Sequence, residues 1–259
     1  MSRTLKLTIS YDGTRFVGWQ RQAHGVSIQG LLEDALARFE GGAVSVQGAG
    51  RTDAGVHALG QVASVQVTCE HTTDALARGV NACLPPDVRV TNVEEAAPDF
   101  HARFSARSKT YRYLFRNAPI VSPFERAFVW HVQEPLDLPA MRAAVDALVG
   151  THDFSSFRST GSDVIGAVRT VVQSEIHQHA GMLVPFVPTG GDHTLLVYEI
   201  GATGFLRHMV RAIAGTLVEI GRGRRAAASM ATLLTRGSRA EAGATAPPHG
   251  LFLVRVDYD

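Results

Sequence analysis

Residues Leu5-Lys6-Leu7-Thr8-Ile9-Ser10-Tyr11 alternate apolar and polar side chains, which is the period-two pattern of a strand with one buried face. The pair Asp12-Gly13 then indicates a turn. From Ser27, a suitable N-cap, apolar residues recur at helical spacing until Gly41-Gly42, namely Ile28, Leu31, Leu32, Ala35, Leu36 and Phe39. The sequence therefore predicts a strand followed by an amphipathic helix.

This alternation of strands and helices continues and is predicted twice along the chain. Further strands are expected at residues 43–47, 61–67, 88–93, 109–116, 168–177, 194–200 and 251–256. Further helices are expected at residues 76–84, before Pro85-Pro86, at 137–149, with Gly150 just past the end, and at 205–220 and 226–234. Such a pattern favours an α+β fold in which helices cover one face of antiparallel sheets.

We place the domains at residues 1–104 and 105–259, with strand 251–256 free to pack back on the sheet. The Gly- and Pro-rich stretch 181–192 and the small, polar stretch 235–248 are interpreted as surface insertions.

The composition is typical of a globular protein that does not cross a membrane. Of 259 residues, 45% are hydrophobic and 19% charged, and no apolar run is long enough to span a bilayer. The first residues lack the apolar segment of a secretory signal, so we expect a cytoplasmic protein. Cys69 and Cys83 are too few for a disulfide framework and lack the C-x-x-C spacing of a zinc site, so no metal is expected.

The densest chemical signal is the loop Gly48-Ala49-Gly50-Arg51-Thr52-Asp53-Ala54-Gly55-Val56-His57. Its glycines allow backbone to approach a ligand closely. The spacing fits neither a dinucleotide-binding G-x-G-x-x-G nor a P-loop, because Asp53 stands where the third glycine would be and no Gly-Lys-Ser/Thr follows. From spacing alone, Asp53 could simply shape a turn.

The segment Arg51-Thr52-Asp53-Ala54-Gly55-Val56-His57-Ala58 resembles the signature loop of the TruA family of tRNA pseudouridine synthases. The resemblance runs nearly end to end. It includes Tyr11-Asp12-Gly13-Thr14, Gly18-Trp19-Gln20, Phe100-His101-Ala102-Arg103-Phe104-Ser105-Ala106, Tyr111-Arg112-Tyr113, His152-Asp153-Phe154, Gly204-Phe205-Leu206-Arg207-His208-Met209-Val210-Arg211 and Ala246-Pro247-Pro248-His249-Gly250-Leu251.

The resemblance implies two ferredoxin-like or RRM-like halves that share a sheet, and a homodimer that converts uridines of the tRNA anticodon arm to pseudouridine. It makes Asp53 the nucleophile. An ionised carboxylate can add either to C1′ of the ribose or to C6 of the base, and the sequence leaves both routes open. The reaction is an isomerisation, so no cofactor is expected.

The resemblance also assigns the companions of Asp53. Arg211 is expected to keep the carboxylate charged, although it could equally be a solvated cation on a helix. Tyr111 is expected to stack on the uracil, while Tyr113 and Phe115 on the same strand face are interpreted as core residues. Arg51 is expected to fill the space of the flipped-out nucleotide, and Leu251 to contact the substrate.

Basic residues cluster locally, as binding of an RNA backbone requires. The residues expected to bind RNA are Arg103, Arg107, Lys109, Arg112, Arg207, Arg222 and Arg224, and Arg116 and Arg225 lie in the same clusters. Any one of them could instead belong to a solvated charged face.

The alternative function is a noncatalytic RRM-like RNA-binding protein, which would not need Asp53. A glycosidase-type hydrolase would ordinarily need a second carboxylate, and none stands near Asp53 in the sequence.

Overall fold

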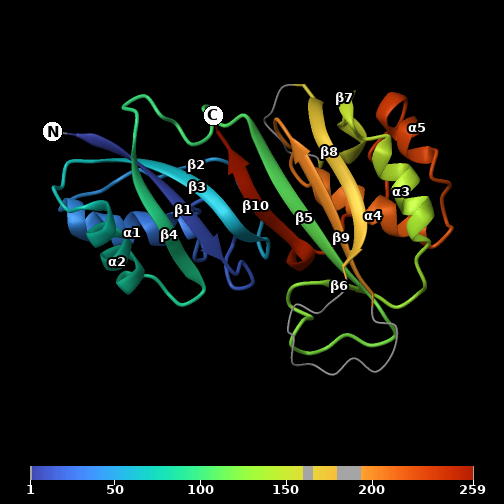
Figure 1. Ribbon diagram of the computed structural model, residues 1–259, viewed down its shortest axis with the longest axis horizontal. Helices are drawn as coiled ribbons and strands as arrows, with labels where there is room; N and C mark the ends of the chain where they lie inside the picture. Colours follow the sequence, from blue (N-terminus) through green and yellow to red (C-terminus); the bar gives the residue numbers. More distant parts are fainter. Residues whose placement is uncertain (1, 160–165, 180–193, 259) are drawn as a thin grey trace. The chain divides into compact units, whose positions relative to one another are not determined.

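A computed structural model describes residues 2–159, 166–179 and 194–258 (Figure 1). The chain divides into two compact units, Met1–Lys109 with Phe252–Asp259, and Thr110–Leu251. The first is called unit 1 and the second unit 2. That these units are separate domains stays a prediction. The described ranges contain ten strands and five α-helices, and no helix in them combines the length and apolar character needed to cross a membrane.

Unit 1 is an antiparallel sheet with two helices. Its elements are β1 (Arg3–Tyr11), α1 (Ile28–Glu40), β2 (Gln47–Gly48), β3 (His57–Val67), α2 (Thr73–Cys83) and β4 (Val88–Ala96). The strand order is β4-β1-β3, and β2 and the start of β10 (Leu251–Asp257) both pair with β3. Helices α1 and α2 contact each other and lie side by side in Figure 1.

Unit 2 is built on the order β5-β9-β8-β7, with β6 paired to β5. Its elements are β5 (Ser108–Asn117), β6 (Trp130–Val132), α3 (Leu138–Asp146), β7 (Gly150–Asp153), β8 (Val168–His179), β9 (Thr194–Ala202), α4 (Met209–Gly221) and α5 (Ser229–Thr235). Helix α3 contacts β8, α4 and α5, and Figure 1 shows these three helices gathered beside β8.

Most of the predicted elements are present, and the α+β class is confirmed. Helix α1 shows why. Ser27 caps it by accepting a hydrogen bond from the Gly30 amide, and Gly41 ends it in the left-handed conformation with φ of 74°. The finer expectation of two RRM-like or ferredoxin-like halves stays a prediction.

The strand predicted at 43–47 is wrong except at its last residue, where β2 begins. Val46 is buried, yet its backbone groups bind side chains of α1. The Glu33 carboxylate accepts from the Val46 amide at 3.2 Å, and the Gln29 amide donates to the Val46 carbonyl at 3.0 Å. Helix side chains thus take the partners that a neighbouring strand would have supplied.

Helix α4 begins four residues later than predicted, because His208 adopts φ of 62° and acts as its N-cap. Arg207 and His208 therefore precede the helix. Helix α5 begins three residues after the predicted start, and α3 ends at Asp146, so Gly150 opens strand β7 and does not cap α3.

The interpretation of 235–248 as a surface insertion fits the mostly exposed residues 235–241 and is wrong for residues 242–246. Ala242 and Ala246 are buried, and the Gly243 amide donates to the Thr216 hydroxyl on α4 at 2.9 Å. A Cβ on Gly215 would lie 1.7 Å from the carbonyl oxygen of Ala244, so this segment, which we call the strap (242–246), lies directly on the α4 backbone. The other expected insertion, 181–192, falls outside the described residues.

Candidate active site

Asp53 lies in unit 1, in the loop between β2 and β3, and is half-buried, while Arg51 is exposed. The Val56 amide donates to the Asp53 carbonyl at 3.1 Å, and Gly55 has φ of 76°. This is a four-residue turn whose third position requires positive φ, for which glycine is suited. The turn fixes the backbone on the C-terminal side of Asp53.

On the other side, Thr52 is held by residues from the start of the chain. The Tyr11 and Thr52 hydroxyls lie 2.8 Å apart, and the Trp19 amide donates to the Thr52 carbonyl at 3.0 Å. Burial raises the pKa of Tyr11 to about 12. The Gln61 amide also donates to the Gly50 carbonyl at 2.8 Å.

His57 closes the loop at the start of β3. The Gly13 amide donates to His57 Nδ1 at 3.0 Å, and the imidazole stacks on Phe252 with ring centroids 4.7 Å apart. A Cβ on Gly13 would lie 2.0 Å from the carbonyl oxygen of Val56, so the two backbones are in direct contact. The motifs at 11–14 and 18–20 therefore position the loop that carries Asp53.

Gly18→Ala is expected to disturb this support and lower the pseudouridine formation predicted from the sequence at least tenfold, with little change in affinity for the predicted substrate, tRNA. Gly18 has φ of 105°, and a Cβ there would lie 2.5 Å from the Thr52 carbonyl oxygen, so both the dihedral and the contact oppose a side chain. Single-turnover kinetics and a tRNA binding titration measure the two quantities. Gly42→Ala, where a Cβ meets nothing within 4 Å, is the matched control. Wild-type turnover in Gly18→Ala would contradict the supporting role.

Unit 2 carries the predicted tyrosine on β5. The Tyr111 ring is buried and meets Phe205 edge to face, with centroids 4.9 Å apart. Tyr113 and Phe115 are fully buried and in contact with each other, as expected of core residues. Phe205 comes from the Gly204–Arg211 motif, so two of the sequence motifs meet here.

Arg211 lies in the first turn of α4 and is fixed by the strap. Its Nε donates to the Ala246 carbonyl at 2.8 Å, and the Ala246 amide donates to the Arg211 carbonyl at 3.0 Å. Burial lowers the pKa of His249, a backbone hydrogen bond at Val129 opposes this, and the charge of Arg211 lowers the pKa further.

The motif that ends in Leu251 packs on β5. The Tyr113 hydroxyl donates to the Pro247 carbonyl at 2.7 Å, and Gly250 lies so close to the Tyr113 ring that a Cβ would be 2.8 Å away. Leu251 is buried at the start of β10. Unit 2 thus brings Arg211, Tyr113 and the 246–251 motif into one packed group.

The residues predicted to bind RNA differ in environment. Arg103, Arg107 and Arg207 are exposed. Arg112 is paired with Glu199, and Arg222 and Arg224 approach Glu134 at 2.6 and 3.6 Å. Lys109 is buried, and this burial, with the charge of Arg103, lowers its pKa. Arg116, which belongs to the same sequence cluster, is buried against Glu125.

Two further cations in unit 2 were missed by sequence reasoning. Burial and then the charge of Arg158 lower the pKa of Arg169, and the Arg169 side chain lies 3.6 Å from the Cβ position of Gly204. The Ser159 hydroxyl is 2.6 Å from His208 Nδ1. Arg158 and Arg169 thus lie beside the Gly204–Arg211 motif, although they are far from it in sequence.

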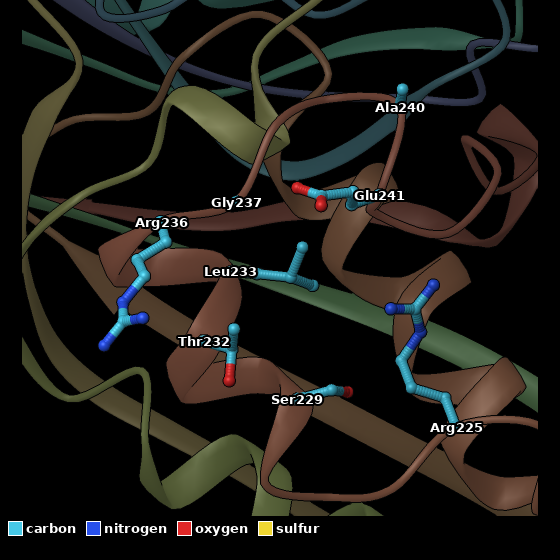
Figure 2. A pocket seen from close by; sticks show the side chains of 8 residues that line it. All are labelled: Arg225, Ser229, Thr232, Leu233, Arg236, Gly237, Ala240 and Glu241. Carbon is cyan, nitrogen blue, oxygen red and sulfur yellow. The ribbon is translucent and has the colours of Figure 1, made fainter.

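A separate hollow of about 560 Å³ opens over α5 in unit 2 (Figure 2). It is lined by Arg225, Ser229, Thr232, Leu233, Arg236, Gly237, Ala240 and Glu241, and none of the residues predicted to catalyse or to bind substrate or RNA is among them. Throughout the described ranges, no three His, Cys, Asp or Glu side chains are grouped so that they could hold a metal ion.

Comparisons with known proteins agree with these motifs. A family model described as tRNA pseudouridine synthase matches residues 7–105 and 144–259. A Myxococcus xanthus protein named tRNA pseudouridine synthase A is 47% identical over 254 residues, covering 98% of this chain and 91% of its own length. A Pelobacter propionicus protein of the same name is 43% identical over 256 residues, covering 99% and 100%. Among solved structures, a chain of a Cbf5-Nop10-Gar1 complex aligns with a TM-score of 0.31 and 12% sequence identity. The alignment covers 83% of this chain and 45% of that chain, and the likeness is weak.

Proposed function

Because the chain belongs to the tRNA pseudouridine synthase family and is an RNA uridine-to-pseudouridine isomerase, we propose that it acts on the tRNA anticodon arm with Asp53 as nucleophile. The observation that carries the proposal is the supported loop of unit 1, in which Asp53 is held by a turn on one side and by Tyr11, Trp19 and Thr52 on the other. The family assignment removes the alternative of a noncatalytic RNA-binding protein.

The reaction breaks the bond from N1 to C1′, turns the uracil and forms a bond from C5 to C1′, while C5 loses a proton and N1 gains one. Asp53 adds to C1′ or to C6 and is released when the new bond is complete. A half-buried carboxylate suits this task, because partial dehydration strengthens a carboxylate nucleophile.

Arg211 serves as the basic partner of the nucleophile, and Tyr111 stacks on the uracil. The geometry of unit 2 supports both roles. The strap orients the Arg211 side chain through its Nε, and Phe205 fixes the Tyr111 ring edge to face. Leu251 completes the apolar surface against the base.

A uridine paired in a stem must leave the helix before it reacts, at a cost of a few kcal/mol. Arg51 occupies the space it vacates, and its exposure two residues before Asp53 supports this role. Arg103, Arg107 and Arg207 contact RNA phosphates, while Arg112, Arg222 and Arg224 exchange carboxylate partners for phosphates on binding. Lys109 contributes least, because it is buried. The protein acts as a homodimer in the cytoplasm.

Site-resolved pseudouridine mapping tests this function. Unmodified bulk tRNA is incubated with the protein, and pseudouridine is expected at uridines of the anticodon arm only. A control with tRNA that lacks uridine in that arm is expected to show none. Pseudouridine confined to other arms would overturn the proposed target while leaving the reaction type intact.

A further inference from the structure

The loop between β4 and β5 in unit 1 holds a tight turn at residues 101–105. The His101 amide donates to the Ser105 hydroxyl at 3.1 Å, and the Ser105 amide donates to the His101 carbonyl at 2.9 Å. The amides of Arg103 and Phe104 both point at His101 Nδ1, at 3.1 and 3.4 Å. Four hydrogen bonds within five residues make this turn a defined structure.

Ala102 anchors the turn to the sheet of unit 1. It is fully buried against Ala49 and Val62. Its amide donates to the Ser64 hydroxyl at 3.1 Å, and its carbonyl accepts from the Tyr258 hydroxyl at 2.7 Å. The turn is therefore fixed through its centre, and the direction of its outer side chains is set by the fold.

Phe104 is the outermost of these side chains. It is 76% exposed, more than any other large apolar side chain in the described part of the chain. Its ring contacts the His101 imidazole, with centroids 4.4 Å apart, and the Arg103 guanidinium lies 5.6 Å from its centroid. The fold thus presents a flat aromatic face to solvent, on which a partner can stack.

The charges around Phe104 identify that partner. His101 and Arg103 flank the ring, Arg107 is close in sequence, and residues 100–117 contain no acidic residue. Asp99 lies two residues before His101. Asp257, whose carbonyl accepts from the Arg107 amide at 2.9 Å, has its carboxylate on the Ser108 hydroxyl at 2.7 Å and on Arg255 at 3.1 Å. An apolar protein surface would have to dehydrate the exposed Arg103 guanidinium beside the ring, whereas RNA brings a phosphate beside a stackable base.

We propose that Phe104 is a stacking platform for an unpaired base of the bound tRNA, with Arg103 paired to an adjacent phosphate. The inference rests on the proposed action on tRNA and adds a binding subsite to it. Stacking on an exposed aromatic ring tolerates any base, so Phe104 contributes affinity and orientation of the arm without reading sequence.

The test uses five variants of the full chain, one of them a control. Phe104→Ala and Phe104→Leu are expected to weaken binding of unmodified tRNA by about 5- to 100-fold, and Phe104→Trp is expected to retain affinity. The salt dependence of binding stays that of the wild type in all three, whereas Arg103→Gln lowers its slope by about one ion. Phe124→Ala is the matched control, because Phe124 is 67% exposed but lies in unit 2 between β5 and β6. It is expected to bind as the wild type.

Three results would overturn the platform. The first is wild-type affinity for tRNA in Phe104→Ala. The second is full affinity in Phe104→Leu, which would show that an apolar side chain suffices. The third is a change of oligomeric state in Phe104→Ala, measured by sedimentation, which would assign the ring to contacts between copies of the chain. Wild-type protein that makes pseudouridine while the Phe104 variants bind normally refutes only this inference. Wild-type protein that makes none refutes the proposed function.

Discussion

Asp53→Asn is expected to lower pseudouridine formation by about 10⁴-fold or more, while tRNA affinity changes by only a few fold. Asparagine has nearly the shape of aspartate, and the hydrogen bond that closes the turn is accepted by the Asp53 backbone carbonyl, so the loop should persist. The neutral amide cannot add to C1′ or C6. A nucleophile contributes little to ground-state binding, so affinity is spared.

Release of tritium from C5-labelled uridine under single-turnover conditions measures the loss, because C5 must shed its hydrogen when the new bond forms. The matched control is Asp34→Asn on α1, whose carboxylate lies at the surface beside Arg21. This variant should turn over as the wild type. Activity within tenfold of the wild type in Asp53→Asn would refute the nucleophile assignment.

Glu125→Ala is expected to lower the free energy of unfolding by about 3–5 kcal/mol. Arg116 and Glu125 are each only 2% exposed, and Nη2 of Arg116 lies 2.7 Å from Oε1 of Glu125. Removing the carboxylate leaves a guanidinium without its counter-ion in the interior of unit 2. Glu125 also lies where the backbone turns sharply, since its amide binds the Ser122 carbonyl and its own carbonyl binds the Phe128 amide.

Denaturation in urea, followed by circular dichroism, measures this loss. The double variant Arg116→Met/Glu125→Leu removes both charges and is expected to recover most of the stability, because the penalty comes from the uncompensated charge. Glu134→Ala, which breaks the exposed pair with Arg222, should change stability little. If the double variant is no more stable than Glu125→Ala, the charge is not the cause.

The sequence predicted elements whose signals are local. Ser27 and Gly41 mark both ends of α1 through interactions within a few residues, and alternation in 5–11 predicts β1. The prediction failed where contacts with residues distant along the chain determine the local structure. Val46 binds side chains of α1 instead of a neighbouring strand, and His208 takes a left-handed conformation that helical periodicity does not reveal.

The candidate site shows the same limit. The Asp53 loop was evident from its motif, but its support by Tyr11 and Trp19 depends on contacts more than thirty residues apart along the chain. Arg116 looked like its basic neighbours and proved to be a buried half of an ion pair. Charge type is readable in a sequence, whereas burial and pairing follow from tertiary packing.

The contact of Gly215 with the strap affects how unit 2 unfolds locally. No side chain separates α4 from residues 242–246, and the amides of Gly243 and Ala246 donate to Thr216 and Arg211, so the strap packs directly on the helix backbone. Helix and strap therefore form one cooperative unit whose amides exchange with solvent together, as in a single foldon. The guanidinium of Arg211 is thus preorganised by the strap, although it is carried by residues near a helix end, where fraying is usual.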